Sequence, residues 1–161
     1  GSGLGARILR TPILFGPNAA GSQAIIGMIS SGQAKLLGGG HYQMRPLDID
    51  DLSEALTILC STSIQDQVTY ELVGPESAPY RDIIEMTAQV MGKTIVFGNV
   101  PILLAKFGAA ITSILKGGGI TPTVIDVITQ DEIVKTNADS ALGITLTPMK
   151  QTLEKMTSLG D

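Results

Sequence analysis

The residues that could perform acid–base or metal chemistry are few, and their spacing does not suit either. A tyrosine transfers protons readily when a lysine one helical turn away lowers its pKa, but none of Tyr42, Tyr70 and Tyr80 has a lysine four positions later. The single histidine, His41, and the single cysteine, Cys60, have no partners at triad or metal-ligand spacing, and no Gly-Lys-Ser/Thr phosphate loop occurs. We therefore predict no catalytic residue and no metal site in this chain.

The pair Asp50-Asp51 lies where the sequence changes from strand chemistry to helix chemistry. Residues 47–49 alternate as a half-buried strand does, and Pro46, which cannot donate to a ladder, precedes them. Apolar residues then recur at helical spacing from Leu52 to Leu59. Because carboxylates accept the free amides of a first helical turn, we predict that Asp50 or Asp51 caps this helix.

Two β-prone runs frame this elbow, at residues 6–14 and 68–73. More than fifty residues and at least one helix separate them, which favours a parallel pair. Residues 34–37 and 43–49 are short extended runs on either side of three glycines, so we predict an antiparallel hairpin there.

Several helices and one more strand follow. Residues 78–91 form an amphipathic pattern that Gly92 ends, and residues 93–100 read as a strand. Residues 102–115 are strongly apolar but fall short of the ~20 residues of a membrane span, so we predict a groove-lining or interfacial helix. Two more helices are predicted to open at Thr121-Pro122 and Thr147-Pro148.

Composition excludes some partners. The chain has 161 residues, 43% of them hydrophobic, and 11 basic against 15 acidic side chains, so it lacks the basic surface of a nucleic-acid-binding protein. Cys60 lies in the apolar-periodic helix and reads as a buried thiol. No secretory signal pattern opens the sequence, and we expect a cytoplasmic protein.

Several motifs together resemble one enzyme family. Residues 49–55 (IDDLSEA) are similar to a turn in the later half of extended and atypical short-chain dehydrogenases/reductases, and residues 8–17 (ILRTPILFGP) to the strand after their catalytic helix. Gly74-Pro75-Glu76, Gly92-Lys93 and Val100-Pro101 match the family further along. The resemblance covers nearly the whole chain and includes NAD-dependent epimerase/dehydratase-like proteins.

The resemblance implies an α/β fold: the C-terminal part of a Rossmann-type short-chain dehydrogenase, with two orphan parallel strands, a small hairpin and several helices. Residues 1–161 would form a single substrate-side unit, with the cofactor-binding N-terminal part absent. Thr11, Pro12 and Ile13 would lie beside the nicotinamide, and Arg45 and His41 would contact the substrate. The alternatives are strand-end packing for the first three and a surface position for the other two.

The family's cofactor-binding and catalytic motifs are missing. Its glycine-rich strand-to-helix loop and its Tyr-x-x-x-Lys pair have no counterpart here. We therefore expect NAD(P) and a small-molecule substrate for a full-length parent, but no cofactor for this chain alone. Ile13 stands where sugar epimerases have Asn, and Asp48 where they have His. These departures favour the atypical branch, which includes a dehydrogenase-like accessory subunit of respiratory complex I.

Three functions remain open. The first is the substrate-binding portion of an NAD(P)-dependent oxidoreductase or epimerase-like protein, inactive on its own. The second is a non-catalytic scaffold or regulator of the same fold, in which the apolar helices bind a protein or a membrane surface. The third is a self-standing small-molecule binding module. Because the predicted parallel strands have uncovered edges, we also expect homo-oligomers.

Overall fold

The computed structural model describes residues 7–61, 68–107 and 122–158. Contacts divide the chain into two compact units. The first comprises Gly1–Ala24, Arg45–Ser77 and Glu132–Asp161, and the second comprises Ile25–Met44 and Ala78–Asp131. Both contain helices and parallel strand pairs, which confirms the predicted α/β class.

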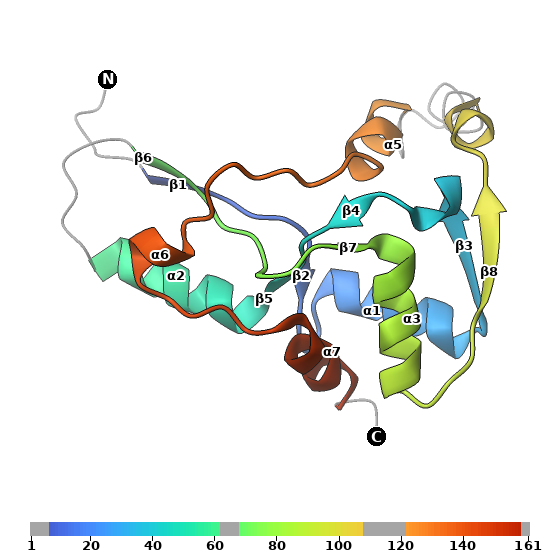
Figure 1. The fold of residues 1–161 in the computed structure, drawn as a ribbon, viewed down its shortest axis with the longest axis horizontal. Coiled ribbons are helices and arrows are strands. Elements are labelled where there is room, and N and C mark those ends of the chain that lie inside the picture. Colours follow the sequence, from blue (N-terminus) through green and yellow to red (C-terminus); the bar gives the residue numbers. More distant parts are fainter. Residues whose placement is uncertain (1–6, 62–67, 108–121, 159–161) are drawn as a thin grey trace. The chain divides into compact units, whose positions relative to one another are not determined.

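The first unit holds two pairs of parallel strands and several helices. Its elements are β1 (Arg7–Arg10), β2 (Leu14–Phe15), β5 (Leu47–Asp48), α2 (Ile49–Ser61), β6 (Val68–Glu71), α6 (Asp139–Leu142) and α7 (Met149–Thr157). Helix α1 (Ala20–Ser30) begins in this unit and continues into the second. In Figure 1, β1 and β6 run side by side, and α2 lies next to α6.

Strands β1 and β6 form the predicted parallel pair. Their register aligns Arg7 with Val68 and Arg10 with Glu71, and the Leu72 amide extends the ladder by donating to the Arg10 carbonyl at 2.9 Å. The predicted first strand is interrupted, however, because β2 pairs with β5 instead of β6. Pro12 lies in the break, where it has no N–H to offer a ladder.

A cluster of apolar side chains forms the core of the first unit. Leu9, Leu14 and Tyr70 are partly buried against it, so β1, β2 and β6 all contribute to its wall. The buried members of the cluster are Leu47, Ala55, Leu72, Ala138, Ile144 and Leu146. The core therefore joins the elbow, the end of β6 and the segment around α6.

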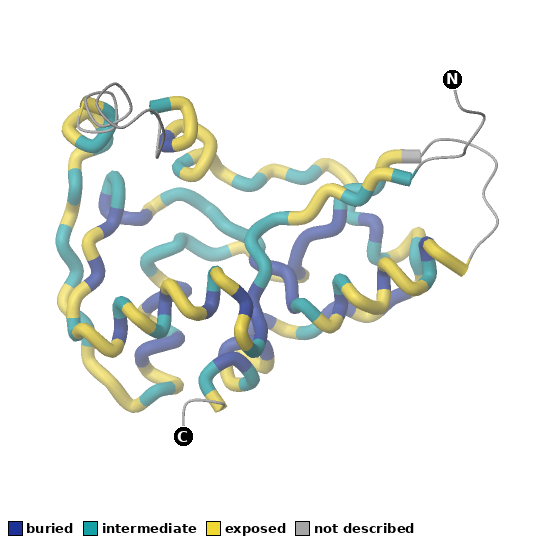
Figure 2. Tube along the Cα trace, turned by 180° about the vertical axis from the view of Figure 1, so that it is seen from behind, coloured by how far each residue is buried: buried dark blue, intermediate teal, exposed yellow. Residues whose placement is uncertain are grey.

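Strand β5 runs directly into α2, as the sequence predicts. The helix buries Asp51, Ala55 and Leu59, which recur every four residues, and Figure 2 shows exposed residues on its other side. Cys60 is exposed, so the prediction of a buried thiol is wrong. One residue past Leu59 is about 100° around the helix, which turns Cys60 away from the buried stripe.

The second unit also contains a parallel strand pair. Its elements are β3 (Gln33–Leu37), the 3₁₀ turn η1 (Gly38–Gly40), β4 (Gln43–Met44), β7 (Ala78–Pro79), α3 (Tyr80–Val90), β8 (Val96–Val100) and α5 (Pro122–Ile128). β3 pairs in parallel with β8, and β4 pairs antiparallel with β7.

The predicted hairpin of residues 34–37 and 43–49 is therefore wrong. β8 pairs with β3 along five residues, whereas β4 is only two residues long. The glycines do adopt positive φ, but they form a 3₁₀ turn that leads the chain away from β3. The five-residue ladder with β8 therefore determines the pairing of β3, although the three glycines are typical of a hairpin loop.

Helix α3 matches its prediction closely. Ile83, Ile84, Thr87 and Ala88 are buried, whereas Val90 near the end of the helix is 38% exposed. Gly92 follows with a φ of 62°, as expected for a helix stop.

Part of the apolar stretch at 102–115 is described. Residues 102–107 are helical, and Leu103, Leu104 and Phe107 are exposed; residues 108–115 lie outside the described part. The Lys106 ammonium forms an ion pair with Asp126 of α5. None of the helices within the described ranges is long and apolar enough to cross a bilayer.

Candidate functional site

Thr11, Pro12 and Ile13 connect β1 to β2 in the first unit. The Ile13 carbonyl accepts from the Leu47 amide at 3.1 Å, which fixes the segment to β5. Gly21 comes so close that a Cβ there would lie 2.8 Å from Ile13 Cγ1, so the first turn of α1 packs on this side chain. The segment is therefore fixed by the main chain of β5 and by the first turn of α1.

The chemistry that this segment offers is limited to hydrogen bonding and contact. Thr11 is exposed and carries a hydroxyl and an amide N–H, whereas Pro12 and Ile13 are half-buried and apolar. A neutral hydroxyl at this position can donate to or accept from a ligand, and within the described ranges no basic side chain is hydrogen-bonded to it that could make it a nucleophile. The nicotinamide contact remains a prediction.

Arg45 belongs to the first unit and is half-buried. Its Nε donates to the Gly74 carbonyl at 3.1 Å and its Nη2 to the Pro75 carbonyl at 3.2 Å, while its amide donates to Glu132 Oε2 at 2.7 Å. The guanidinium thus ties the turn after β6 to the chain that enters β5. Sequence reasoning missed this role, and the predicted substrate contact remains a prediction.

Gly74 explains why the two segments fit so closely. Its amide donates to the Arg45 carbonyl at 3.1 Å, and a Cβ at this position would lie 2.0 Å from the Pro46 carbonyl oxygen. Only glycine fits this approach of two backbones. The Gly-Pro-Glu motif of the sequence therefore has a packing reason.

His41 belongs to the second unit, where it is exposed directly after η1. A Cβ on Gly39 would lie 3.0 Å from His41 Nε2, so the imidazole folds back over the glycine turn. The predicted substrate contact of His41 also remains a prediction.

Two tyrosines stack in the second unit. The rings of Tyr42 and Tyr80 have centroids 5.6 Å apart and planes 22° apart. Burial, and secondarily the neighbouring Tyr80, raises the pKa of Tyr42 to about 12, and burial also raises the pKa of Tyr80. Both phenols stay protonated at neutral pH, so they can donate hydrogen bonds but cannot act as general bases.

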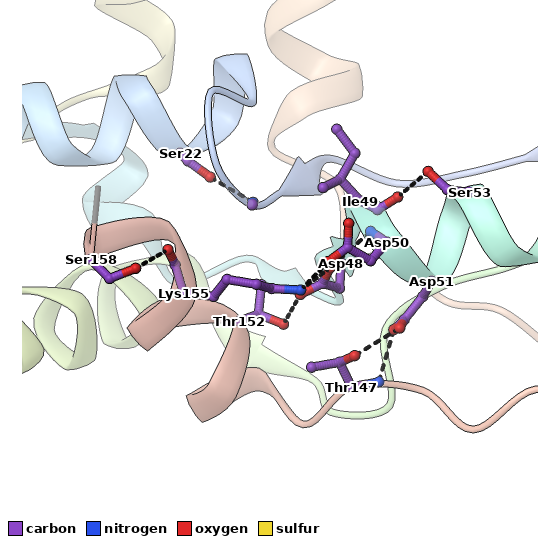
Figure 3. A network of polar contacts seen from close by, with 11 residues as sticks. Ser22, Asp48, Ile49, Asp50, Asp51, Ser53, Thr147, Thr152, Lys155 and Ser158 are labelled. Carbon is purple, nitrogen blue, oxygen red and sulfur yellow. Dashed lines mark hydrogen bonds and ion pairs between the residues drawn. The ribbon is translucent and has the colours of Figure 1, made fainter. Parts of the chain in front are cut away.

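Asp48 forms the centre of a polar network at the elbow (Figure 3). Its carboxylate is fully buried and accepts from the Asp50 amide at 2.9 Å, the Thr152 hydroxyl at 2.8 Å and Lys155 Nζ at 2.8 Å. The prediction that Asp50 or Asp51 caps α2 is therefore wrong, because Asp48 accepts the first-turn amide. The network ties α7 to the elbow.

Lys155 connects this buried carboxylate to an exposed one. Its Nζ also lies 2.7 Å from Asp50 Oδ2. Burial lowers the pKa of Lys155, but hydrogen bonds to Asp48 and Asp50 outweigh this effect, so the pKa is raised overall. Lys155 is thus a fixed positive charge and not a proton donor at neutral pH.

Asp51 and Glu76 fix the start of α7. Asp51 accepts from the Thr147 amide at 2.8 Å and from the Thr147 hydroxyl at 2.7 Å, and Glu76 Oε2 accepts from the Met149 amide at 2.6 Å. Glu76 therefore caps α7, because Pro148 before it has no side chain that could do so. The carboxylates of Asp51 and Glu76 therefore have a structural role at the start of α7.

One open pocket lies in the first unit, beside β6. Its volume is about 370 Å³, and it is lined by Thr69, Tyr70 and Glu71 of β6, by residues 135–138 and by Ala141. Sequence reasoning did not find it, because it arises where a segment distant in sequence covers the strand edge. Across the residues that the structure describes, no three His, Cys, Asp or Glu side chains are grouped to hold a metal ion.

Solved structures with the same fold are numerous, although no protein-family model and no curated protein sequence matches the chain. Human epimerase family protein SDR39U1, solved with NADPH, aligns with a TM-score of 0.71 and 16% identity over 99% of this chain and 50% of that one. MoeE5, solved with UDP-glucuronic acid and NAD, aligns with a TM-score of 0.67 and 18% identity over 95% of this chain and 46% of that one.

A third example is the UDP-glucuronic acid 4-epimerase from Bacillus cereus, solved with NAD, with a TM-score of 0.61 and 19% identity over 93% of this chain and 41% of that one. The chain thus has the Rossmann-like fold of short-chain dehydrogenase/reductase and NAD-dependent epimerase proteins. It spans about half the length of the solved structures that it matches.

Proposed function

We propose that this chain is the substrate-side portion of an NAD(P)-dependent oxidoreductase or epimerase-like protein and is inactive on its own. The observation that carries the proposal is the fold match, which accounts for 99% of this chain and half of a structure that holds NADPH. The sequence of this chain lacks the Tyr-x-x-x-Lys pair and the glycine-rich loop of the family that it resembles, which is why we propose that it is inactive on its own. The cofactor-binding part would belong to the remainder of such a protein.

The placement of Thr11, Pro12 and Ile13 supports a role beside the cofactor. Ligands of parallel α/β sheets bind beyond the carboxyl ends of the strands, and this segment follows the carboxyl end of β1. It is rigidly attached to β5 through Ile13, so it could position a flat ring with little loss of freedom. Thr11 would supply one hydrogen bond to that ring.

Arg45 and His41 are proposed to contact the small-molecule substrate. The guanidinium of Arg45 uses two of its five N–H groups on the Gly74 and Pro75 carbonyls, which leaves donors for an anionic or carbonyl group. His41 is exposed and could donate or accept. We further propose a cytoplasmic location, where the exposed Cys60 would stay reduced.

A non-catalytic scaffold is the second candidate function. The observation that favours it is a set of exposed apolar side chains on the second unit, at Leu103, Leu104 and Phe107 and at Val127 and Ile128 of α5. Large exposed apolar groups of this kind are typical of interaction surfaces. Such a protein would keep the fold without turnover.

The product of the complete gene tests the first proposal. We expect it to bind NADH or NADPH with a dissociation constant of about 1–100 μM, and Thr11→Val to weaken binding about fivefold through the loss of one hydrogen bond. Thr69→Val, which removes an exposed hydroxyl from β6, is the matched control and should leave affinity unchanged. Absence of binding by the complete product would contradict the proposal, and binding without turnover on any carbonyl or sugar-nucleotide substrate would favour the scaffold.

A further inference from the structure

We draw no further inference here: the strongest candidate, the open pocket of about 370 Å³ between β6 and residues 135–141 of the first unit, carries none because β6 directly follows residues 62–67, which lie outside the described part of the chain, and nothing in the structure shows what fills or covers this pocket.

Discussion

Asp48, Asp50 and Asp51 lie within four positions of each other, yet they differ in burial and in the number of their partners. Asp48 is buried and accepts hydrogen bonds from three donors. Asp50 is exposed and shares the Lys155 ammonium with Asp48, and Asp51 accepts a hydrogen bond from the Thr147 hydroxyl. A buried carboxylate stabilises a fold only when its oxygens are fully bonded. The elbow therefore depends most on Asp48.

Replacing Asp48 tests this difference. Asp48→Asn keeps the size of the side chain but removes the charge that faces Lys155 and leaves one oxygen where three donors converge, so we expect a loss of about 3 kcal/mol of unfolding free energy. Asp50→Asn, at a 73% exposed side chain, should cost less than about 1 kcal/mol. Chemical denaturation measures both, and equal losses for the two variants would show that Asp48 has no special role.

Tyr42 should give stability a dependence on alkaline pH. Because burial raises the pKa of its phenol from 10.0 to about 12, the unfolded chain loses this proton first, and stability falls as pH rises from about 10 to about 12. The raised pKa of Lys155 acts in the same direction. Tyr42→Phe should make the denaturation midpoint fall less steeply across this range, and a fall as steep as that of the unmodified chain would contradict this assignment.

Among the elements, those with strong local signals were predictable and those set by distant partners were not. The elbow into α2, helix α3 with its Gly92 stop and helix α7 after Pro148 follow from periodicity and turn residues. The pairing of β3 with β8 does not, because it depends on a strand about sixty residues away. The capping carboxylate was misplaced by two or three residues for a related reason: Thr147, which is the partner of Asp51, lies 96 positions away.

The side chain of Asn137 completes the edge of strand β6. Asn137→Asp keeps an acceptor for the Val73 amide but directs a carboxylate oxygen at the Val73 carbonyl, so we expect a loss of about 2 kcal/mol. Asn99→Asp makes the same change at an exposed residue of β8 and should cost less than about 0.5 kcal/mol. Thermal unfolding of the two variants decides the matter, since matching midpoints would show that the edge contact is not needed.

At the scale of the whole molecule, the fold and its class were accessible from the sequence, whereas the candidate site was not. The two motifs at residues 8–17 and 49–55 correspond to β1–β2 and to the start of α2, and Gly16 of the first motif packs against the Ile49 side chain of the second. Arg45 shows why site roles are harder: its sequence position indicated a ligand contact, but its guanidinium also secures the Gly74–Pro75 turn. The periodicity of the sequence does not predict such a contact between a side chain and a distant backbone.

The strand-to-helix turn after β2 is the place in the described residues where a phosphate could most readily approach a helix start, and it is filled. The Gly16 amide donates to the buried Ser22 hydroxyl at 2.9 Å, and a Cβ on Gly16 would lie 2.5 Å from the Ile49 side chain. Pro17 has no N–H to offer. Glycines 38–40 form η1 and do not open an α-helix. Neither of these two turns offers the free amides at a helix start that a pyrophosphate requires, and the absence of a cofactor site from this chain alone stays a prediction.

Calorimetric titration of the 161-residue chain with NADH and with NADPH measures whether this chain alone binds a dinucleotide. Contacts from Thr11 and its neighbours would supply one or two hydrogen bonds of about 1 kcal/mol each, so we predict no measurable binding up to about 1 mM of either nucleotide. A micromolar dissociation constant for either one would contradict the account, because it would require a cofactor site within this chain.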